Sequence, residues 1–100
     1  MTPVETEDVR AVYHLYVVRL EGHDRSDFQE YLKNSGVGTG IHYPIPLPKL
    51  KAYESMGCDE NDFIHSIKGC GEIVSLPMFP ELTEENIDYV VGKIREFFQH

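Results

Sequence analysis

A short stretch in the first half of the chain combines small residues with polar and ionisable ones. It runs Gly38-Thr39-Gly40-Ile41-His42-Tyr43-Pro44 and leads into a proline-rich segment that ends at Pro48. Hydroxyl, imidazole and phenol groups both donate and accept hydrogen bonds, so a loop of this kind can present polar groups to a ligand. The alternative is that the glycines permit a tight strand and that His42 and Tyr43 only pack or hydrogen-bond locally. That structural interpretation is the more common one for a short glycine pattern.

The other reactive side chains are scattered. The five histidines form no His-x-x-x-His pair and none lies at ligand spacing from a cysteine, so the sequence gives little support to a metal site. No serine sits in a Gly-x-Ser-x-Gly elbow, so a hydrolase triad has no positive support either. A small hydrolase that uses His42 with Cys58 or Ser75 is a minor hypothesis.

Composition narrows the class of protein. The chain has 100 residues, 41% of them hydrophobic, with a net charge of −8 and a pI near 4.9. An acidic chain repels phosphate backbones and anionic lipids, so we expect no nucleic-acid or membrane partner. The acidic N-terminus lacks the features of a signal peptide, and no apolar run is long enough to span a membrane. We expect a cytoplasmic protein with one domain over residues 1–100, in which residues 1–10 form a flexible leader.

The elements that must position the Gly38–Pro44 stretch follow from local patterns. Asp24 can cap a helix, Gly36 stops it, and Thr83 followed by two glutamates starts another helix with a long apolar stripe. The expected elements are a strand at Val12–Arg19, a helix at Arg25–Lys33, an extended run at Val37–Tyr43, short helices at Pro48–Tyr53 and around Phe63–Ile67, a strand at Glu72–Leu76 and a helix from Glu84 to Phe98. This order predicts an α/β protein, with a small three-stranded sheet and helices packed against it.

Four blocks of the sequence, taken in order, resemble one known family. They are Ala11–Arg19, Gly36–Leu47, Ala52-Tyr53 and Glu72–Thr83, and they include Thr39-Gly40-Ile41-His42-Tyr43-Pro44 and Ser75-Leu76-Pro77-Met78-Phe79-Pro80. The chain is similar to the C-terminal domain of the DegT/StrS sugar-nucleotide aminotransferases, from about Ala11 to Phe98. The resemblance implies the aspartate-aminotransferase fold, whose small domain has a mostly antiparallel sheet.

The resemblance also implies a parent enzyme and a place for this chain within it. In such enzymes pyridoxal 5'-phosphate carries an amino group, often from glutamate, to a nucleotide-linked keto-sugar in amino-sugar biosynthesis. The Schiff-base lysine and most of the cofactor site belong to a larger N-terminal domain, and full-length relatives are homodimers. None of the chain's lysines matches the Schiff-base position, so the resemblance implies a chain that is inactive alone and holds no cofactor. Those lysines are Lys33, Lys49, Lys51, Lys68 and Lys93.

The resemblance places the loop near the mouth of the active site, where it helps line the sugar-nucleotide site. His42 and Tyr43 are then polar contacts or gates, while Thr39 and Gly40 allow close approach to the backbone. The chain departs from the family pattern after this loop, because Pro48 stands where relatives commonly have a histidine. The competing hypothesis is a free-standing acidic module for protein interaction or regulation, which pairs through a sheet edge or through the Phe97-Phe98 end.

Overall fold

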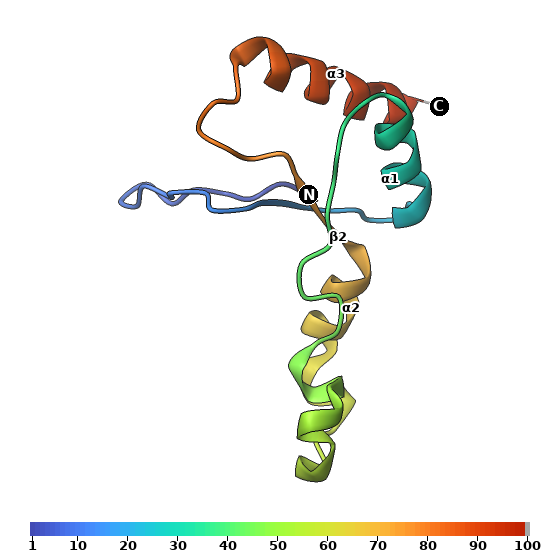
Figure 1. The fold of residues 1–100 in the computed structure, drawn as a ribbon. Helices are drawn as coiled ribbons and strands as arrows, with labels where there is room; N and C mark the ends of the chain where they lie inside the picture. The colour runs from blue at the N-terminus through green and yellow to red at the C-terminus, as the bar shows by residue number, and fades with distance from the viewer. Residues whose placement is uncertain (100) are drawn as a thin grey trace.

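The structure is a computed structural model that describes residues 1–99. Figure 1 shows a small sheet at the centre, two helices on one side of it and a long projection on the other. The elements, in chain order, are β1 (Tyr16–Arg19), α1 (Arg25–Asn34), the 3-10 helices η1 (Leu47–Lys49), η2 (Lys51–Met56) and η3 (Glu60–Phe63), α2 (Ile64–Glu72), β2 (Ile73–Leu76) and α3 (Glu84–Gln99).

The sheet is antiparallel and has two strands, β1 and β2. Val18 pairs with Val74 and Val17 with Ser75. The strand predicted from Val12 starts only at Tyr16, and Val12 itself is exposed. Residues before β1 instead form an extended loop whose start returns to the strand, where the Met1 amino group donates to the Arg19 carbonyl at 2.8 Å.

The third strand predicted at Val37–Tyr43 is reduced to a single bridge between Gly40 and Ser75. The flanking residues explain why it does not extend. Glycine weakens a strand, Tyr43 has a left-handed φ of 57°, and Pro44 has no N–H to donate to a ladder. The α/β class and the antiparallel pairing are confirmed, whereas the prediction of three full strands was wrong for the residues described.

The core lies between the sheet and helices α1 and α3. Phe28 and Leu32 of α1 are fully buried, and Val74 of β2 lies beneath them. The Phe28 ring meets the ring of Phe97 edge to face, with centroids 5.2 Å apart. Asp24 caps α1 by accepting from the Asp27 N–H at 3.1 Å, as its sequence position predicts. The buried core residues are Val18, Leu20, Phe28, Leu32, Val37 and Val74.

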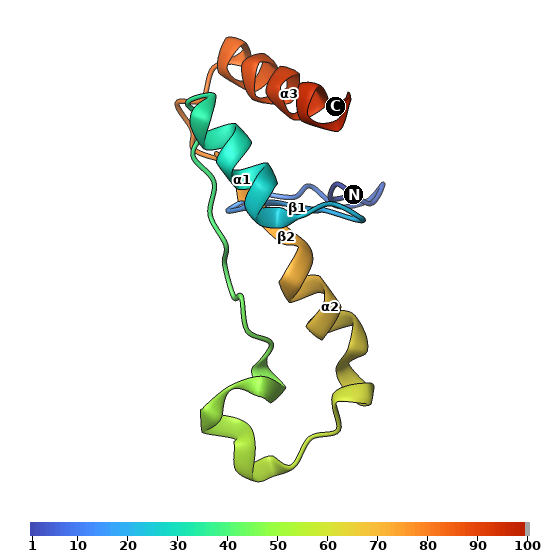
Figure 2. The same ribbon diagram turned by 90° about the vertical axis from the view of Figure 1, so that its right-hand side faces the viewer.

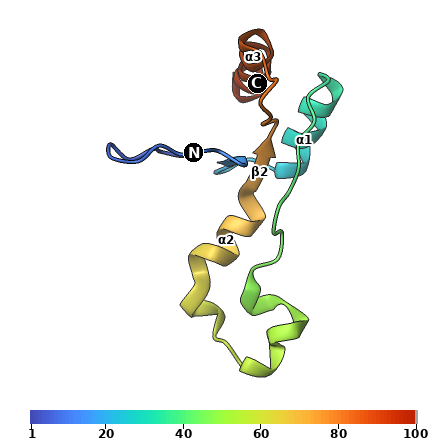
Figure 3. The ribbon, with the colours of Figure 1, turned by 60° about the vertical axis from the view of Figure 1, so that its left-hand side comes forward.

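Residues 44–72 form a projection that we call the arm. It contains η1, η2, η3 and α2, and Figures 2 and 3 show it running down from the sheet and back, away from α1 and α3. Almost every residue of the arm from 51 to 66 is exposed. Its short helices arise from proline at the start of η1 and from the Asp59 side chain, which caps η3 by accepting from the Asn61 N–H.

Two arginines fasten the base of the arm to the body. Arg19 in β1 forms an ion pair with Glu72, the last residue of α2, and this hydrogen bond raises the pKa of Arg19. Arg25 at the start of α1 donates to the carbonyls of Cys70 at 2.7 Å and Ile73 at 3.3 Å. Because the last carbonyls of a helix lack partners within it, a guanidinium satisfies them well. The arm is therefore held where it leaves the sheet and free along its length.

The arm gives the chain much more surface than a compact protein of its mass. The accessible surface is 7859 Å², whereas size scaling gives ~5,800 Å² for a compact protein of this mass. The radius of gyration is 15.9 Å, against about 13 Å for a compact chain of this length. The surface in excess of the compact value is available to a partner.

Glu96→Gln is expected to reduce the loss of stability at alkaline pH. Glu96 accepts hydrogen bonds from the Tyr31 hydroxyl and the Lys93 ammonium, each at 2.9 Å, and these bonds raise the pKa of both groups. A raised pKa in the folded state stabilises the protein below the ordinary pKa, about 10 for both groups. That stabilisation disappears as the pH rises through the folded pKa.

The measurement is the melting temperature against pH, from neutral to strongly alkaline. The wild-type curve should fall more steeply above about pH 10 than the Glu96→Gln curve. Glu85→Gln, in the first turn of the same helix, is the control for loss of one carboxylate. Parallel curves for all three proteins would show that the Glu96 hydrogen bonds do not contribute.

Candidate functional site

The Gly38–Pro44 stretch runs beside β2 and is joined to it at one position. The Gly40 N–H donates to the Ser75 carbonyl at 3.1 Å, and the Ser75 N–H donates to the Gly40 carbonyl at 2.8 Å. This pair of bonds fixes the backbone in the middle of the loop, while the residues on either side follow separate paths. Gly40 is therefore the point from which His42 and Tyr43 project.

His42 is tied to the same serine through its side chain. Its Nδ1 lies 2.8 Å from the Ser75 Oγ. The ring folds back over Gly40, where a Cβ would lie 3.5 Å from the His42 Cε1. Ser75 is only 4% exposed, whereas His42 is exposed. The imidazole thus has one nitrogen held by the protein and stands at the surface.

Thr39 and Tyr43 lie at the two ends of the site and have different surroundings. The Thr39 Oγ1 accepts from the Gln29 side chain of α1 at 3.1 Å, so this end of the loop is fixed to a helix. Tyr43 is 82% exposed and has φ of 57°, a conformation that is costly for a bulky residue. The structure therefore brings Gly40 and His42 together on Ser75, and it holds Thr39 and Tyr43 apart from them.

Ser75 and Gln29 are the two residues that the sequence did not associate with the loop. Gln29 gives no signal, because a polar residue on a helix normally faces solvent. Ser75 gives a weak one, since it interrupts the apolar run Ile73–Leu76 and a hydroxyl in a buried strand needs a partner. The sequence does not say which residue that partner is.

The geometry argues against Ser75 as a hydrolytic nucleophile. His42 does meet Ser75, but a residue that is 4% exposed offers no room for an ester or amide carbonyl to reach its Oγ. Cys58, the other nucleophile considered with His42, is exposed and lines a hollow in the arm. Neither pairing forms an accessible catalytic dyad.

The lysines do not fit the requirements of pyridoxal phosphate. A Schiff-base lysine needs an amine whose pKa is lowered by burial or by a neighbouring positive charge. Lys93 instead has a raised pKa because it donates to Glu96, and Lys49 lies 3.4 Å from Glu60. Lys33, Lys51 and Lys68 are exposed. The residues of this chain therefore form no site for the cofactor, and we derive no chemical step through it.

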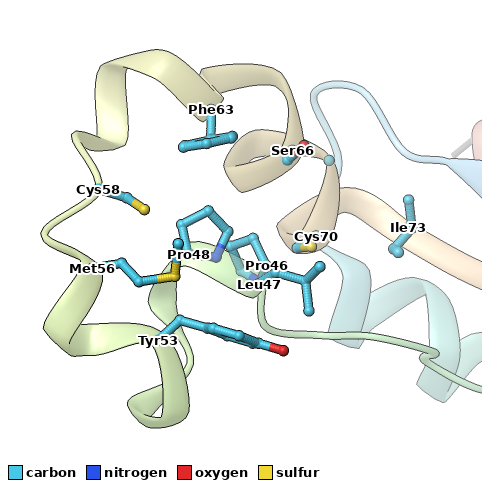
Figure 4. A pocket seen from close by; sticks show the side chains of 11 residues that line it. Pro46, Leu47, Pro48, Tyr53, Met56, Cys58, Phe63, Ser66, Cys70 and Ile73 are labelled. Carbon is cyan, nitrogen blue, oxygen red and sulfur yellow. The ribbon is translucent and has the colours of Figure 1, made fainter.

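The largest hollow lies in the arm and is apolar. Figure 4 shows the Tyr53 ring on one side and Phe63 on the other, with Met56 and Cys58 at one end. Its volume is ≈ 750 Å³, and it opens to solvent. Its polar side chains are few, so it offers a sugar or a phosphate little to bind. Among residues 1–99, no three His, Cys, Asp or Glu side chains are grouped to hold a metal ion, and no helix could cross a membrane.

Gly40→Ala is expected to leave the stability of the chain within about 0.5 kcal/mol of wild type. The only atoms near the added methyl group belong to the His42 ring, at ordinary contact distance, and φ at Gly40 is not left-handed. Gly36→Ala, in contrast, introduces a side chain at φ of 81° directly after α1 and should cost about 1 kcal/mol.

Urea unfolding of the two variants and wild type measures both effects. If Gly40→Ala were the more damaging change, the fold itself would need a glycine at position 40. If it is neutral, any requirement for glycine there comes from what the loop contacts outside this chain.

The comparisons with known proteins agree on one group. The model of the DegT/DnrJ/EryC1/StrS aminotransferase family matches residues 1–95. A pleiotropic regulatory protein of Geobacillus stearothermophilus is 40% identical over 100 residues, which are 100% of this chain and 26% of that protein. A dTDP-3-amino-3,6-dideoxy-alpha-D-galactopyranose transaminase of Aneurinibacillus thermoaerophilus is 38% identical over 95 residues, which are 95% of this chain and 25% of that enzyme.

A solved structure extends the similarity to three dimensions. The crystal structure of S. venezuelae DesV in complex with a ketimine intermediate superposes with a TM-score of 0.87 at 28% identity. The match covers 99% of this chain and 26% of that chain. The arm is thus part of the shared fold. The chain spans about a quarter of the length of the proteins it matches.

Proposed function

Because this chain belongs to the DegT/DnrJ/EryC1/StrS aminotransferase family, we propose that it acts as the C-terminal small domain of a pyridoxal-phosphate-dependent sugar-nucleotide aminotransferase. The whole enzyme would transfer an amino group, from glutamate in the usual case, to a nucleotide-linked keto-sugar. Its cofactor and Schiff-base lysine would lie in a larger domain, outside these 100 residues. The chain alone would be inactive, and the complete enzyme would be a homodimer.

The observation that carries this proposal is the surface that the chain leaves uncovered. The exposed area exceeds that of a compact protein by about 2,000 Å², and a standard specific interface buries only about 800 Å² on each partner. The exposed apolar side chains of the arm include Leu47, Met56 and Ile64, which are 65%, 69% and 59% exposed. Covering this surface with the missing three quarters of an enzyme would explain why the arm keeps its extended shape.

The loop supports the more specific part of the proposal, a role in lining the sugar-nucleotide site. His42 presents a ring nitrogen outward, and Tyr43 presents a phenol at 82% exposure on a strained backbone. Both groups suit hydroxyl and phosphate oxygens. Thr39 and Gly40 would bring the backbone close to the ligand. Strained residues with exposed polar groups are typical of binding sites, which favours a role beyond packing for Tyr43.

A chimeric enzyme tests the function. In the Aneurinibacillus transaminase, the quarter that matches this chain is replaced by residues 1–100, and the transaminase reaction is assayed. We expect activity in the chimera and none in the isolated chain, which should also show no lysine-linked absorbance band with pyridoxal phosphate. A folded but inactive chimera, or a cofactor band from the chain alone, would contradict the proposal.

Two variants of the chimera test the loop. His42→Ala and Gly40→Ala should each raise KM for the sugar nucleotide or lower kcat/KM about tenfold, the loss expected for one binding contact. Lys68→Ala, at an exposed position on α2, is the matched control. Equal activity in all three variants would remove the loop from the proposed site.

A regulatory module is the second candidate, and the description of the Geobacillus relative favours it. That relative is about four times as long as this chain, so regulation and a large first domain are compatible there. The reading frame upstream of Met1 separates the two candidates. Roughly 250 or more upstream residues, the size of a large domain, would support the enzyme, while their absence would support the module.

A further inference from the structure

We infer that Ser75 is a positioning residue for His42, which holds the imidazole by Nδ1 so that Nε2 is the ring atom offered to a ligand. The inference rests on the proposed function only for the identity of that ligand, the oxygen atoms of a sugar nucleotide. The positioning itself rests on the geometry of this chain.

Ser75 is suited to act as a fixed anchor. It lies within β2, its neighbour Val74 is fully buried, and its own N–H and carbonyl are both bonded to Gly40. A serine side chain has only one rotatable bond before its oxygen, so the Oγ position follows the strand closely. The loop backbone and the imidazole therefore share one rigid support, 33 residues away from His42 in the sequence.

His42, in turn, has little else to fix it. The residue is exposed, and the next two residues are the strained Tyr43 and Pro44, so the chain leaves the sheet directly after the imidazole. The ring of an exposed histidine adopts several orientations about its broad terminal torsion. A hydrogen bond of 2.8 Å to a buried hydroxyl selects one of them, and it also satisfies that hydroxyl.

The choice of a hydroxyl as partner has a chemical consequence. A carboxylate can only accept, so it would fix the proton on Nδ1 and leave Nε2 as an acceptor. A serine hydroxyl both donates and accepts. When Ser75 donates to Nδ1, Nε2 carries the proton and can donate to a phosphate or carbonyl oxygen. When Ser75 accepts from Nδ1, Nε2 can accept from a sugar hydroxyl. His42 can therefore match either type of oxygen without moving.

Nuclear magnetic resonance of the ¹⁵N-labelled chain tests this inference without any ligand. The Nδ1 chemical shift of His42 should differ from the shifts of His14 and His65, which are exposed. Ser75→Ala should move the Nδ1 shift of His42 onto theirs. Ser75→Thr, which keeps a hydroxyl, should restore the wild-type shift, and Ser55→Ala, at an exposed site on η2, should change nothing.

A His42 Nδ1 shift that is unchanged in Ser75→Ala, with the chain still folded by circular dichroism, would overturn the inference. If Ser75→Ala unfolds the chain, Ser75→Thr decides alone: a His42 shift that matches wild type supports the inference, and one that matches His14 and His65 overturns it.

The ligand is tested separately in the chimera, with dTDP as the probe. Ser75→Ala should weaken dTDP binding about three- to tenfold, the effect of one hydrogen bond, and Ser75→Thr should largely recover it. An inactive chimera with a normal shift response would refute the proposed function and leave the positioning role in place. An active chimera without the shift response would do the reverse.

Discussion

Replacing Phe28 by alanine is expected to lower the free energy of unfolding by about 3–5 kcal/mol. Phe28 is 0% exposed and lies at the centre of the core, with its ring 5.2 Å from that of Phe97 and 5.9 Å from that of Phe98. The substitution removes the burial of the ring and both aromatic contacts between α1 and α3. Because small domains are stable by only about 5–15 kcal/mol in total, the variant should be close to unfolded at room temperature.

Phe63→Ala is the matched control for this prediction. Phe63 is 39% exposed and lies in the arm, beside the open hollow. The same change of side chain should cost about 1 kcal/mol there, because much of the ring is already in water. Urea unfolding followed by circular dichroism measures both variants. Similar losses at the two positions would mean that α1, α3 and the sheet do not form the main core.

The helices were predictable because their signals are local. Asp24 accepts from the Asp27 N–H and Thr83 accepts from the Asn86 N–H, so both caps act within one turn of their own position. The apolar stripe of α3 likewise repeats along one helix. Such features need no knowledge of what the rest of the chain does, and the observed bounds of α1 and α3 differ from the predicted ones by a residue at most.

The sheet was harder to predict because its partners are distant in the sequence. The strand expected from Val12 begins at Tyr16, since β2 is only four residues long and offers partners for no more. Apolar, β-branched residues such as Val12 favour a strand, yet Val12 is exposed here. A longer strand would need a further partner, which the described residues do not supply.

The candidate site shows the same division. The polar residues of the loop could be named from their types, because the prediction needed only their composition and the resemblance. Their arrangement depends on Ser75, which is 33 residues from His42, and on Gln29 of α1. Only the folded chain brings these side chains to the loop. Sequence reasoning therefore found what the loop carries and missed what holds it.

The base of the arm connects the site to the proposed partner domain. Arg25 holds the carbonyl of Ile73, two residues before Ser75, and Arg19 holds Glu72. The loop enters the arm at one end, at Pro44, and β2 leaves it at the other, at Ile73. A partner that covers the arm would therefore bind directly beside the residues that fix His42. This places the proposed domain interface and the proposed substrate site next to each other.

Polar replacement of three arm residues is expected to abolish assembly with a large domain while leaving the chain folded. The variant combines Leu47→Ser, Met56→Gln and Ile64→Asn. All three side chains are more than half exposed, so the core loses nothing and the melting temperature should stay near that of wild type. If a large domain covers them, each loses roughly 1 kcal/mol or more of apolar burial at the interface. The dissociation constant should therefore rise about 100-fold or more.

Titration of the chain against the separately expressed first three quarters of the Aneurinibacillus transaminase measures this constant. The control replaces three exposed polar residues of the same arm, with Lys51→Ser, Glu54→Gln and Lys68→Ser, and should bind within a few-fold of wild type. Equal binding by both triple variants would show that the large domain does not cover the apolar arm. Because the substitutions lie outside the core, weaker binding by the apolar variant alone reports on the interface rather than on folding. That result would tie the excess surface of this chain to the partner that the enzyme proposal requires.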